Sequence, residues 1–510
     1  MSSLFRRSVI FTEFNEKTIY LGEFIREKDR KAVIVYLKSG KDAIDYHIIK
    51  QMNALVFDGH IDQLRHSLSK NRSAYLLSND ELKNIKDVMS LIDIHRKKWL
   101  FNDVHLVYRG EAPKVILEPR YGKMNIHWIE EEMLLVEDLL VKSPLYEAVN
   151  DNDELNVMII GLGKVGREVL KQVASQSFIN LHTKVNITAM DLHANHVKAQ
   201  IKHEAPLAFK GLTIDFFDVD VTTFAFNESI ANMKHRPTYV VICLYQQQLS
   251  IETAIYLRRH YENRTKSDPV KIHVAIDNET TETLILKNLK ETYNYIDDVR
   301  SFKIQSFGIY KENYKRYIYE DLRNRVLCYL THGLYTYSEE ELRKKSHEDI
   351  KELSSKLDMK NTRAFVTHLP TKLNLLHFTI CFVDEIQTHF DQVLIQLSEA
   401  VEKHKENLAK LDGHRWNAFR KFDGFTPLPI EEIREDHYQI FMKKMHARID
   451  LEDSKKLAIA IGYDEDFFIQ KDIEAIRNIP IILKLYNEKI KSFDANAKYI
   501  MIKYVGEIIE

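Results

Sequence analysis

Three glycines carry the clearest chemical signal in this sequence. The stretch Leu155 to Gly166 reads LNVMIIGLGKVG, and Gly161, Gly163 and Gly166 follow its apolar run in the spacing GxGxxG. The first glycine of this spacing permits a tight turn from strand to helix. The second lets the backbone approach a pyrophosphate, and the third lets the helix pack on the strand. The spacing therefore predicts a phosphate-binding turn at the amino-terminus of a helix.

An acidic residue stands where such a turn needs one. The apolar segment Val185 to Met190 reads as a second strand and ends in Asp191, the residue expected to hold ribose hydroxyls. Residues 176–184 add a loop, so the interval from the glycines is somewhat longer than usual. Because a carboxylate repels a 2′-phosphate, Asp191 favours NAD or another adenine nucleotide over NADP. The alternative is a Rossmann fold that keeps its glycines for packing and has lost its ligand.

Further strand ends belong to the same edge of the predicted sheet. Later strands are expected at residues 212–217, 239–244, 272–276 and 302–309. In open α/β sheets the ligand lies outside the carboxyl ends of the strands. We therefore predict a nucleotide site that contains the glycines, Asp191 and these further residues: Lys164, Val165, Asp218, Leu244 and Tyr245. For Asp218, a solubilising role in the loop is the alternative.

The first 150 residues show a second alternation of apolar runs and amphipathic segments. Strands are expected at residues 8–12, 32–37, 54–58, 74–78 and 104–108, with helices at 16–27, 61–68 and 80–95. This alternation predicts right-handed βαβ units on a parallel sheet. The turn after the first strand has no glycine at the GxGxxG positions, and Glu13 and Glu16 would repel a pyrophosphate. We expect this domain to be a structural or dimerising copy.

The last part of the chain is predicted to be mainly helical. Glycine is scarce there, residues 314–330 and 338–357 have helical periodicity, and residues 384–411 form a long amphipathic pattern. Trp416 and Arg420 are four residues apart, which places an aromatic plane beside a guanidinium on one helical face. Such a pair is suited to a base and a phosphate. The alternative is that Trp416 and Phe419 are core residues and that Arg420 pairs with a carboxylate.

Length and composition bound the class of protein. The chain has 510 residues and a net charge of −2, so three domains are expected, with no general attraction to nucleic acid. No apolar stretch is long enough for a signal peptide or a membrane span. The three cysteines are far apart, which suits reduced cysteines in a cytoplasmic protein and gives no metal-type spacing. The predicted fold class is α/β, with Rossmann-like doubly wound parallel sheets in domains 1–150 and 151–335 and a mainly α domain at 336–510.

Two tandem Rossmann units of which only one carries GLGKVG resemble the RCK family, whose TrkA-N-type domains regulate potassium transport. The resemblance also rests on Asp58-Gly59 and on Leu77 to Glu81 with Asn84 shortly after, and it covers roughly residues 8–310. It implies that NAD(H), ATP, ADP or a similar nucleotide binds and that occupancy changes the shape of a dimer interface. A homodimer is therefore expected, and a membrane transporter is one implied partner.

The last domain resembles the RyR domain, named from the ryanodine receptor repeat and found in bacterial proteins beside TrkA-N-type domains. The matching residues are His414, Arg415, Trp416, Arg420, Gly424 and Phe425, with Asn361, Arg363 and His368 upstream and His446 and residues 472–483 downstream. Phe425 stands where Trp is common, and Thr426-Pro427 where Tyr-Gly is frequent. The resemblance implies a second nucleotide-like ligand at His414, Arg415, Trp416, Arg420, Phe425 and His446.

Several classes of function follow from these patterns. The first is a regulatory ligand sensor, and by analogy of architecture it could read a nucleotide signal in bacterial defence. The second is a cytosolic gating subunit of a potassium transporter. The third is an enzyme, either an NAD-dependent oxidoreductase or a nucleotide hydrolase. The sequence has no GxSxG, HExxH or P-loop and no recognisable proton donor after Ile309, so no catalytic or metal residue is assigned and the sensor is favoured.

Overall fold

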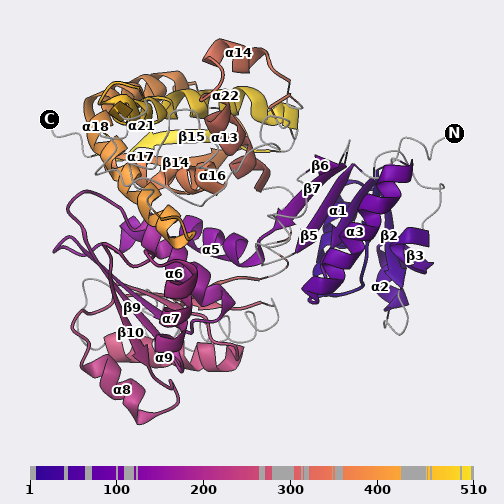
Figure 1. Ribbon diagram of the computed structural model, residues 1–510, viewed down its shortest axis with the longest axis horizontal. Helices are drawn as coiled ribbons and strands as arrows, with labels where there is room; N and C mark the ends of the chain where they lie inside the picture. The colour runs from indigo at the N-terminus through magenta and orange to yellow at the C-terminus, as the bar shows by residue number, and fades with distance from the viewer. Residues whose placement is uncertain are drawn as a thin grey trace. The chain divides into compact units, whose positions relative to one another are not determined.

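The computed structural model describes most of the chain (Figure 1). The described residues are 7–38, 44–63, 72–98, 102–107, 120–121, 124–262, 270–277, 304–309, 311, 314, 321–346, 349–350, 360–386, 388–426, 455, 458–459, 462–493 and 497–506. The chain divides into two compact units. The first contains residues 1–134, 310–320 and 355–357, and the second contains residues 135–309, 321–354 and 358–510. Within the described ranges, no helix is long and apolar enough to cross a membrane.

The first unit is a Rossmann-like α/β domain. Its described strands form one sheet in the order β3-β2-β1-β4-β5-β7-β6, parallel except for the β6–β7 pair. The strands are β1 (Ser8–Phe11), β2 (Val33–Lys38), β3 (Leu55–Asp58), β4 (Arg72–Leu76), β5 (Asp103–Val107), β6 (Arg120–Tyr121) and β7 (Met124–Ile129). The helical segments are α1 (Glu16–Lys28), α2 (Tyr46–Gln51), η1 (Ile61–Gln63) and α3 (Glu81–Lys98).

Side chains of β1 point alternately to the two faces of the sheet, and each face is covered by helices. Ile10 packs with Val88 and Leu91 of α3 on one face of the sheet. Val9 and Phe11 pack with residues of α1 on the opposite face. A parallel strand covered on both faces must be apolar throughout, which is why β1 reads as a continuous apolar run.

The second unit contains another Rossmann-like sheet. Its strand order is β10-β9-β8-β11-β12-β13, and every pair is parallel. The strands are β8 (Glu154–Ile160), β9 (Lys184–Asp191), β10 (Thr213–Asp218), β11 (Tyr239–Ile242), β12 (Lys271–Ala275) and β13 (Ile304–Phe307). The helical segments are η2 (Leu145–Ala148), α6 (Lys164–Gln176), α7 (Ala194–Glu204), α8 (Phe224–Ala231) and α9 (Gln247–Glu262), together with α5 (Glu131–Lys142), whose residues up to Leu134 belong to the first unit. On β8, Val157 packs toward α6, whereas Met158 packs toward α9, so the sheet is doubly wound.

A mainly helical region completes the second unit. Its elements are α13 (Asp321–Gly333), α14 (Glu339–Lys344), α16 (Lys360–Thr367), α17 (Leu369–Leu375), β14 (Phe378–Val383), α18 (Phe390–Phe422), α21 (Phe467–Arg477), α22 (Ile479–Phe493) and β15 (Tyr499–Tyr504). Apolar residues of α13, α16, α18, α21 and α22 share one core. The tandem Rossmann-like sheets followed by a helical region confirm the predicted fold class.

Some predicted element bounds were wrong. The helix predicted at 384–411 begins at Phe390 and continues to Phe422, because Arg415, Ala418 and Phe419 extend its buried stripe. Within the helix predicted at 338–357, α14 ends at Lys344 and Lys345 has extended backbone, residues 349–350 are helical, and residues 347–348 and 351–357 lie outside the described residues. The pair β14–β15 and the elements β6, β7 and α5 were not predicted. Residues 64–68 of the predicted helix at 61–68 lie outside the described residues.

Candidate functional site

The glycine turn lies where the strand order of the second sheet reverses, between β8 and β11. The Gly161 amide donates a hydrogen bond to the Met190 carbonyl of β9, at 2.8 Å. On the other side, the Cys243 amide donates to the Ile160 carbonyl, at 2.7 Å. These bonds hold the turn between its two neighbouring strands, at the position where open α/β sheets place a ligand.

Gly161 and Gly166 are required by the packing of the turn itself. Gly161 has a φ of +89°, and a Cβ on it would lie 2.6 Å from the carbonyl oxygen of Cys243. A Cβ on Gly166 would lie 1.8 Å from the carbonyl oxygen of Gly161. Neither position can accept a side chain without moving backbone, so both glycines serve the close approach of α6 and β11 to the end of β8.

Gly163 has no such packing role. It is exposed, its φ is −65°, and no atom lies within 4 Å of the place where a Cβ would stand. It is the N-cap of α6, and no side chain makes a capping hydrogen bond there. The first amide groups of a helix have no partner within the helix, so this open end can receive an anion.

Asp191 is held directly against the glycine turn. Its Oδ2 accepts a hydrogen bond from the Leu162 amide at 2.7 Å, and its Oδ1 accepts one from the His193 amide at 2.9 Å. An ionised carboxylate can accept about four hydrogen bonds, so capacity remains for ribose hydroxyls. Asp191 is half-buried and is the last residue of β9, at the carboxyl end of the strand.

Asp218 lies beside Asp191 because the two residues are register partners on β10 and β9. Its two carboxylate oxygens accept hydrogen bonds from the backbone amide and the side-chain amide of Asn195, each at 2.8 Å. These bonds lower the pKa of Asp218. The carboxylate therefore caps the start of α7, and it is exposed at the same edge as the predicted site.

The other predicted residues occupy the same edge with different exposure. Lys164 is exposed, while Val165 and Leu244 are half-buried. Tyr245 is fully exposed. Arg167 was not predicted as a site residue: its Nε donates to the Leu162 carbonyl at 3.2 Å, and its guanidinium donates to Gln200. The sequence signal for it was its position directly after the third glycine, which places a second cation near the turn.

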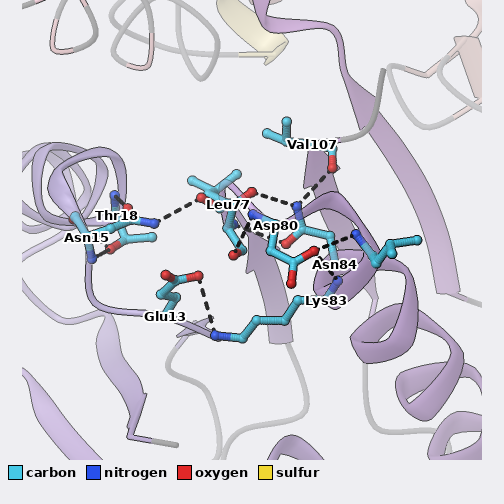
Figure 2. A network of polar contacts seen from close by, with 10 residues as sticks. Glu13, Asn15, Thr18, Leu77, Asp80, Lys83, Asn84 and Val107 are labelled. Atoms are coloured by element: carbon cyan, nitrogen blue, oxygen red, sulfur yellow. Dashed lines mark hydrogen bonds and ion pairs between the residues drawn. The ribbon is translucent and has the colours of Figure 1, made fainter. Parts of the chain in front are cut away.

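The corresponding turn of the first unit is closed by side chains (Figure 2). The Asn15 side chain accepts a hydrogen bond from the Thr18 amide at 3.0 Å, and the Thr18 hydroxyl accepts from the Asn15 amide at 3.0 Å. The Asn15 side-chain amide also donates to the Leu77 carbonyl of the neighbouring chain segment at 3.0 Å. This capping box gives the amide groups of Asn15 and Thr18 at the start of α1 partners within the chain. At the start of α6, Gly163 has no side chain that could do the same.

The segment after β4 completes the network in Figure 2. Asn84 is fully buried, and its Oδ1 accepts from the Ser78 amide at 3.0 Å. Its Nδ2 donates to the carbonyls of Ser78 and Val107, each at 2.9 Å. Lys83 reaches Glu13 at 3.4 Å. The residues that supported the RCK resemblance here therefore bond to one another and to the strand ends.

The RyR-like residues are divided between different environments. Arg415 is buried and pairs with Asp412 through Nε at 2.8 Å and Nη2 at 3.2 Å. Lys372, also buried, lies 2.7 Å from the same carboxylate. The His414 ring stacks on Phe178 with centroids 6.1 Å apart. Arg415 thus belongs to a buried ionic network, and His414 faces the loop that follows α6.

Trp416, Arg420 and Phe425 do lie together. The Arg420 guanidinium is 5.9 Å from the Trp416 ring centroid and 4.4 Å from the Phe425 ring centroid. All three residues are half-buried, whereas Phe419 is buried. His446 lies outside the described residues. Within the part of the chain that is described, no group of three or more His, Cys, Asp or Glu residues is arranged to hold a metal ion.

The fold and site define a chain with tandem Rossmann-like domains and one open glycine turn. No protein-family model matches its sequence, and no curated protein does. Among solved structures, GsuK bound to ADP is 12% identical with a TM-score of 0.37, covering 61% of this chain and 68% of that chain. The GsuK channel is 11% identical with a TM-score of 0.36, covering 61% and 63%.

A third match among solved structures is a dipicolinate synthase subunit from Bacillus halodurans. It is 10% identical with a TM-score of 0.21, and the match covers 62% of this chain and 96% of that chain. This chain spans 63% of the length of the GsuK channel chain that it matches. At these identities and scores the likenesses carry no information about ligand or partner.

We predict that the three glycines differ in what they contribute to stability. Gly166→Ala should lower the free energy of unfolding by about 1 to 3 kcal/mol, because the new Cβ meets the Gly161 carbonyl. Gly163→Ser should change it by less than about 0.5 kcal/mol, since serine is a favoured N-cap and its Cβ meets open space. Urea unfolding of both variants measures this difference, and equal destabilisation would contradict the geometry.

The buried network around Arg415 predicts a pH dependence of stability. Burial lowers the pKa of Lys372 to about 8, helped by Arg415 and opposed by Asp412, whereas a free lysine titrates near about 10.4. Between these values the unfolded chain binds more protons than the folded chain, so this lysine makes unfolding more costly as pH rises. Urea unfolding between about pH 7.5 and about pH 9.5 should show the wild type gaining stability relative to Lys372→Met. If the free energies of unfolding of wild type and Lys372→Met changed in parallel with pH, the lowered pKa of Lys372 would be contradicted.

Proposed function

We propose that this chain is a regulatory ligand sensor that binds an adenine nucleotide with a diphosphate, of the ADP or NAD type, at its second Rossmann-like domain. The observation that carries the proposal is the open space at Gly163. Packing explains Gly161 and Gly166, but the fold would accept a side chain at Gly163. A glycine that packing does not require, at an uncapped helix end, is suited to the close approach of a phosphate.

The charges around the turn suit an anion on one side and hydroxyl groups on the other. The amino-terminus of a helix carries about half a positive charge, and Lys164 and Arg167 add cations in the same first turn. Asp191 lies on the opposite side of the turn, held by the Leu162 amide. A diphosphate at Gly163 with its ribose at Asp191 satisfies both sides, whereas a 2′-phosphate would meet the carboxylate.

A sensing role is favoured over catalytic turnover because the helical region packs on the second Rossmann-like domain. The helical region contacts α6, the helix that begins at the open turn, through the end of α18 (Figure 1). A ligand at this turn would therefore lie on an element shared with a second part of the unit. We further propose a homodimer as the working form, which light scattering would test with and without nucleotide.

We predict that the wild-type protein binds ADP and NAD⁺ in isothermal titration calorimetry, and binds NADP⁺ more weakly. Gly163→Asp should weaken ADP binding by about 30-fold or more, because a carboxylate replaces the open space where phosphate would lie. Aspartate is a favoured N-cap, so α6 should remain folded. Ala199→Asp adds the same charge to an exposed position of α7 and should leave binding unchanged.

Two results would overturn this function. Folded wild-type protein with no affinity for ADP, ATP, NAD⁺ or NADH would remove the nucleotide site. Unchanged ADP binding by Gly163→Asp would place any nucleotide elsewhere. Turnover of NADH or of a nucleotide by the wild type, lost in Gly163→Asp, would instead assign the same site to an enzyme.

A further inference from the structure

Helix α6 connects the open turn to the helical region. It begins at Lys164, directly after Gly163, and ends at Gln176, and its 13 residues span about 20 Å. Its first turn forms the candidate phosphate end. Its second half and the loop that follows contact α16, α17 and the end of α18.

An ion pair joins α6 to the end of α18. Lys171 Nζ lies 2.7 Å from Asp423 Oδ1, with side-chain exposures of 25% and 12%, so the pair is largely shielded from water. The ammonium also lies 5.5 Å from the Phe419 ring centroid. Although burial opposes it, Asp423 and Glu168 raise the pKa of Lys171. Both partners are therefore charged near neutral pH.

Polar contacts at the end of α6 reach two more elements. The Gln176 side chain donates to the Ala364 carbonyl of α16 at 3.3 Å. His368, the N-cap of α17, has its Nε2 2.9 Å from the Phe178 carbonyl oxygen. Because a carbonyl can only accept, Nε2 carries the proton. The chain segment from Gln176 to Phe178 thus joins the helical region through two hydrogen bonds and the Phe178–His414 stack.

The opposite end of α6 is fixed to the glycine turn. Gly166 lies so close to the Gly161 carbonyl that no Cβ fits between them. Arg167 bonds to the Leu162 carbonyl and to Gln200 of α7. A shift of the turn must therefore move the helix, because close-packed elements do not deform continuously.

We propose that α6 couples nucleotide binding to docking of the helical region, so that a bound diphosphate favours the arrangement in which Lys171 pairs with Asp423. This inference rests on the proposed nucleotide site. Coupling is reciprocal, so a change that weakens docking of the helical region must also weaken the binding of the nucleotide. The region has other attachments, including the Arg363–Glu137 pair between α16 and α5 with both bonds at 2.6 Å. Loss of the Lys171–Asp423 pair should therefore leave the unit folded.

The test measures ADP affinity by calorimetry in Asp423→Lys, Lys171→Glu and the double exchange. Asp423→Lys adds positive charge on the side of α18 that faces α6, so direct electrostatics alone would tighten the binding of anionic ADP. Coupling predicts the opposite sign, a weakening of about fivefold or more. The double exchange restores an ion pair and should bring the affinity back to within about twofold.

A matched control lies in the same helical region. Arg477→Glu breaks the exposed Arg477–Glu402 pair between α21 and α18, at 2.8 Å, and should leave ADP affinity unchanged. Circular dichroism of every variant checks the fold. Hydrogen exchange in the wild type should slow at residues 360–375 on addition of ADP, and this slowing should be lost in Asp423→Lys.

The outcomes separate this inference from the function on which it rests. Wild-type binding of ADP with equal or tighter binding by Asp423→Lys overturns the coupling and leaves the nucleotide site in place. Failure of the double exchange to recover affinity also counts against coupling through this pair. Absence of ADP binding in the folded wild type overturns both.

Discussion

The close approach of Gly166 to the carbonyl of Gly161 is the constraint on which the geometry of the glycine turn depends. Because no side chain fits between them, α6 packs directly on the end of β8, and the helix and the turn form one closely packed piece. One end of that piece is the open space at Gly163, and the other lies against Asp423 and Ala364 of the helical region. A small anion bound at the first end would therefore act on an element that a second part of the unit also contacts.

The two Rossmann-like sheets of the chain differ in how the first helix begins. In the first unit, Asn15 and Thr18 satisfy the end of α1 with their own side chains, and Asn15 also bonds to Leu77. The capping box at that helix end supplies partners within the chain for the amide groups of Asn15 and Thr18. In the second unit Gly163 has no side chain to offer, so the end of α6 is left to water or to an anion.

Local patterns were sufficient to predict most strands of the two Rossmann-like sheets, the glycine turn and the proximity of Trp416 to Arg420, because each of these leaves its signal in neighbours within a few residues. The pair β14–β15 was missed, since its two strands are far apart in the chain. Arg415 matched the RyR pattern, yet it pairs with Asp412, whose carboxylate also binds Lys372 of α17, and local spacing could not reveal that long-range contact. Arg167 had a sequence signal in its position after the third glycine, but its contact with Gln200 forms only in the folded chain.

A crystal structure of the protein grown with ADP would test the central claim most directly. We expect diphosphate density at the start of α6, within hydrogen-bond distance of the backbone beside Gly163, with the ribose hydroxyls on the carboxylate of Asp191. Density for ADP at the start of α1, or among Trp416, Arg420 and Phe425 with the turn at Gly163 empty, would contradict it.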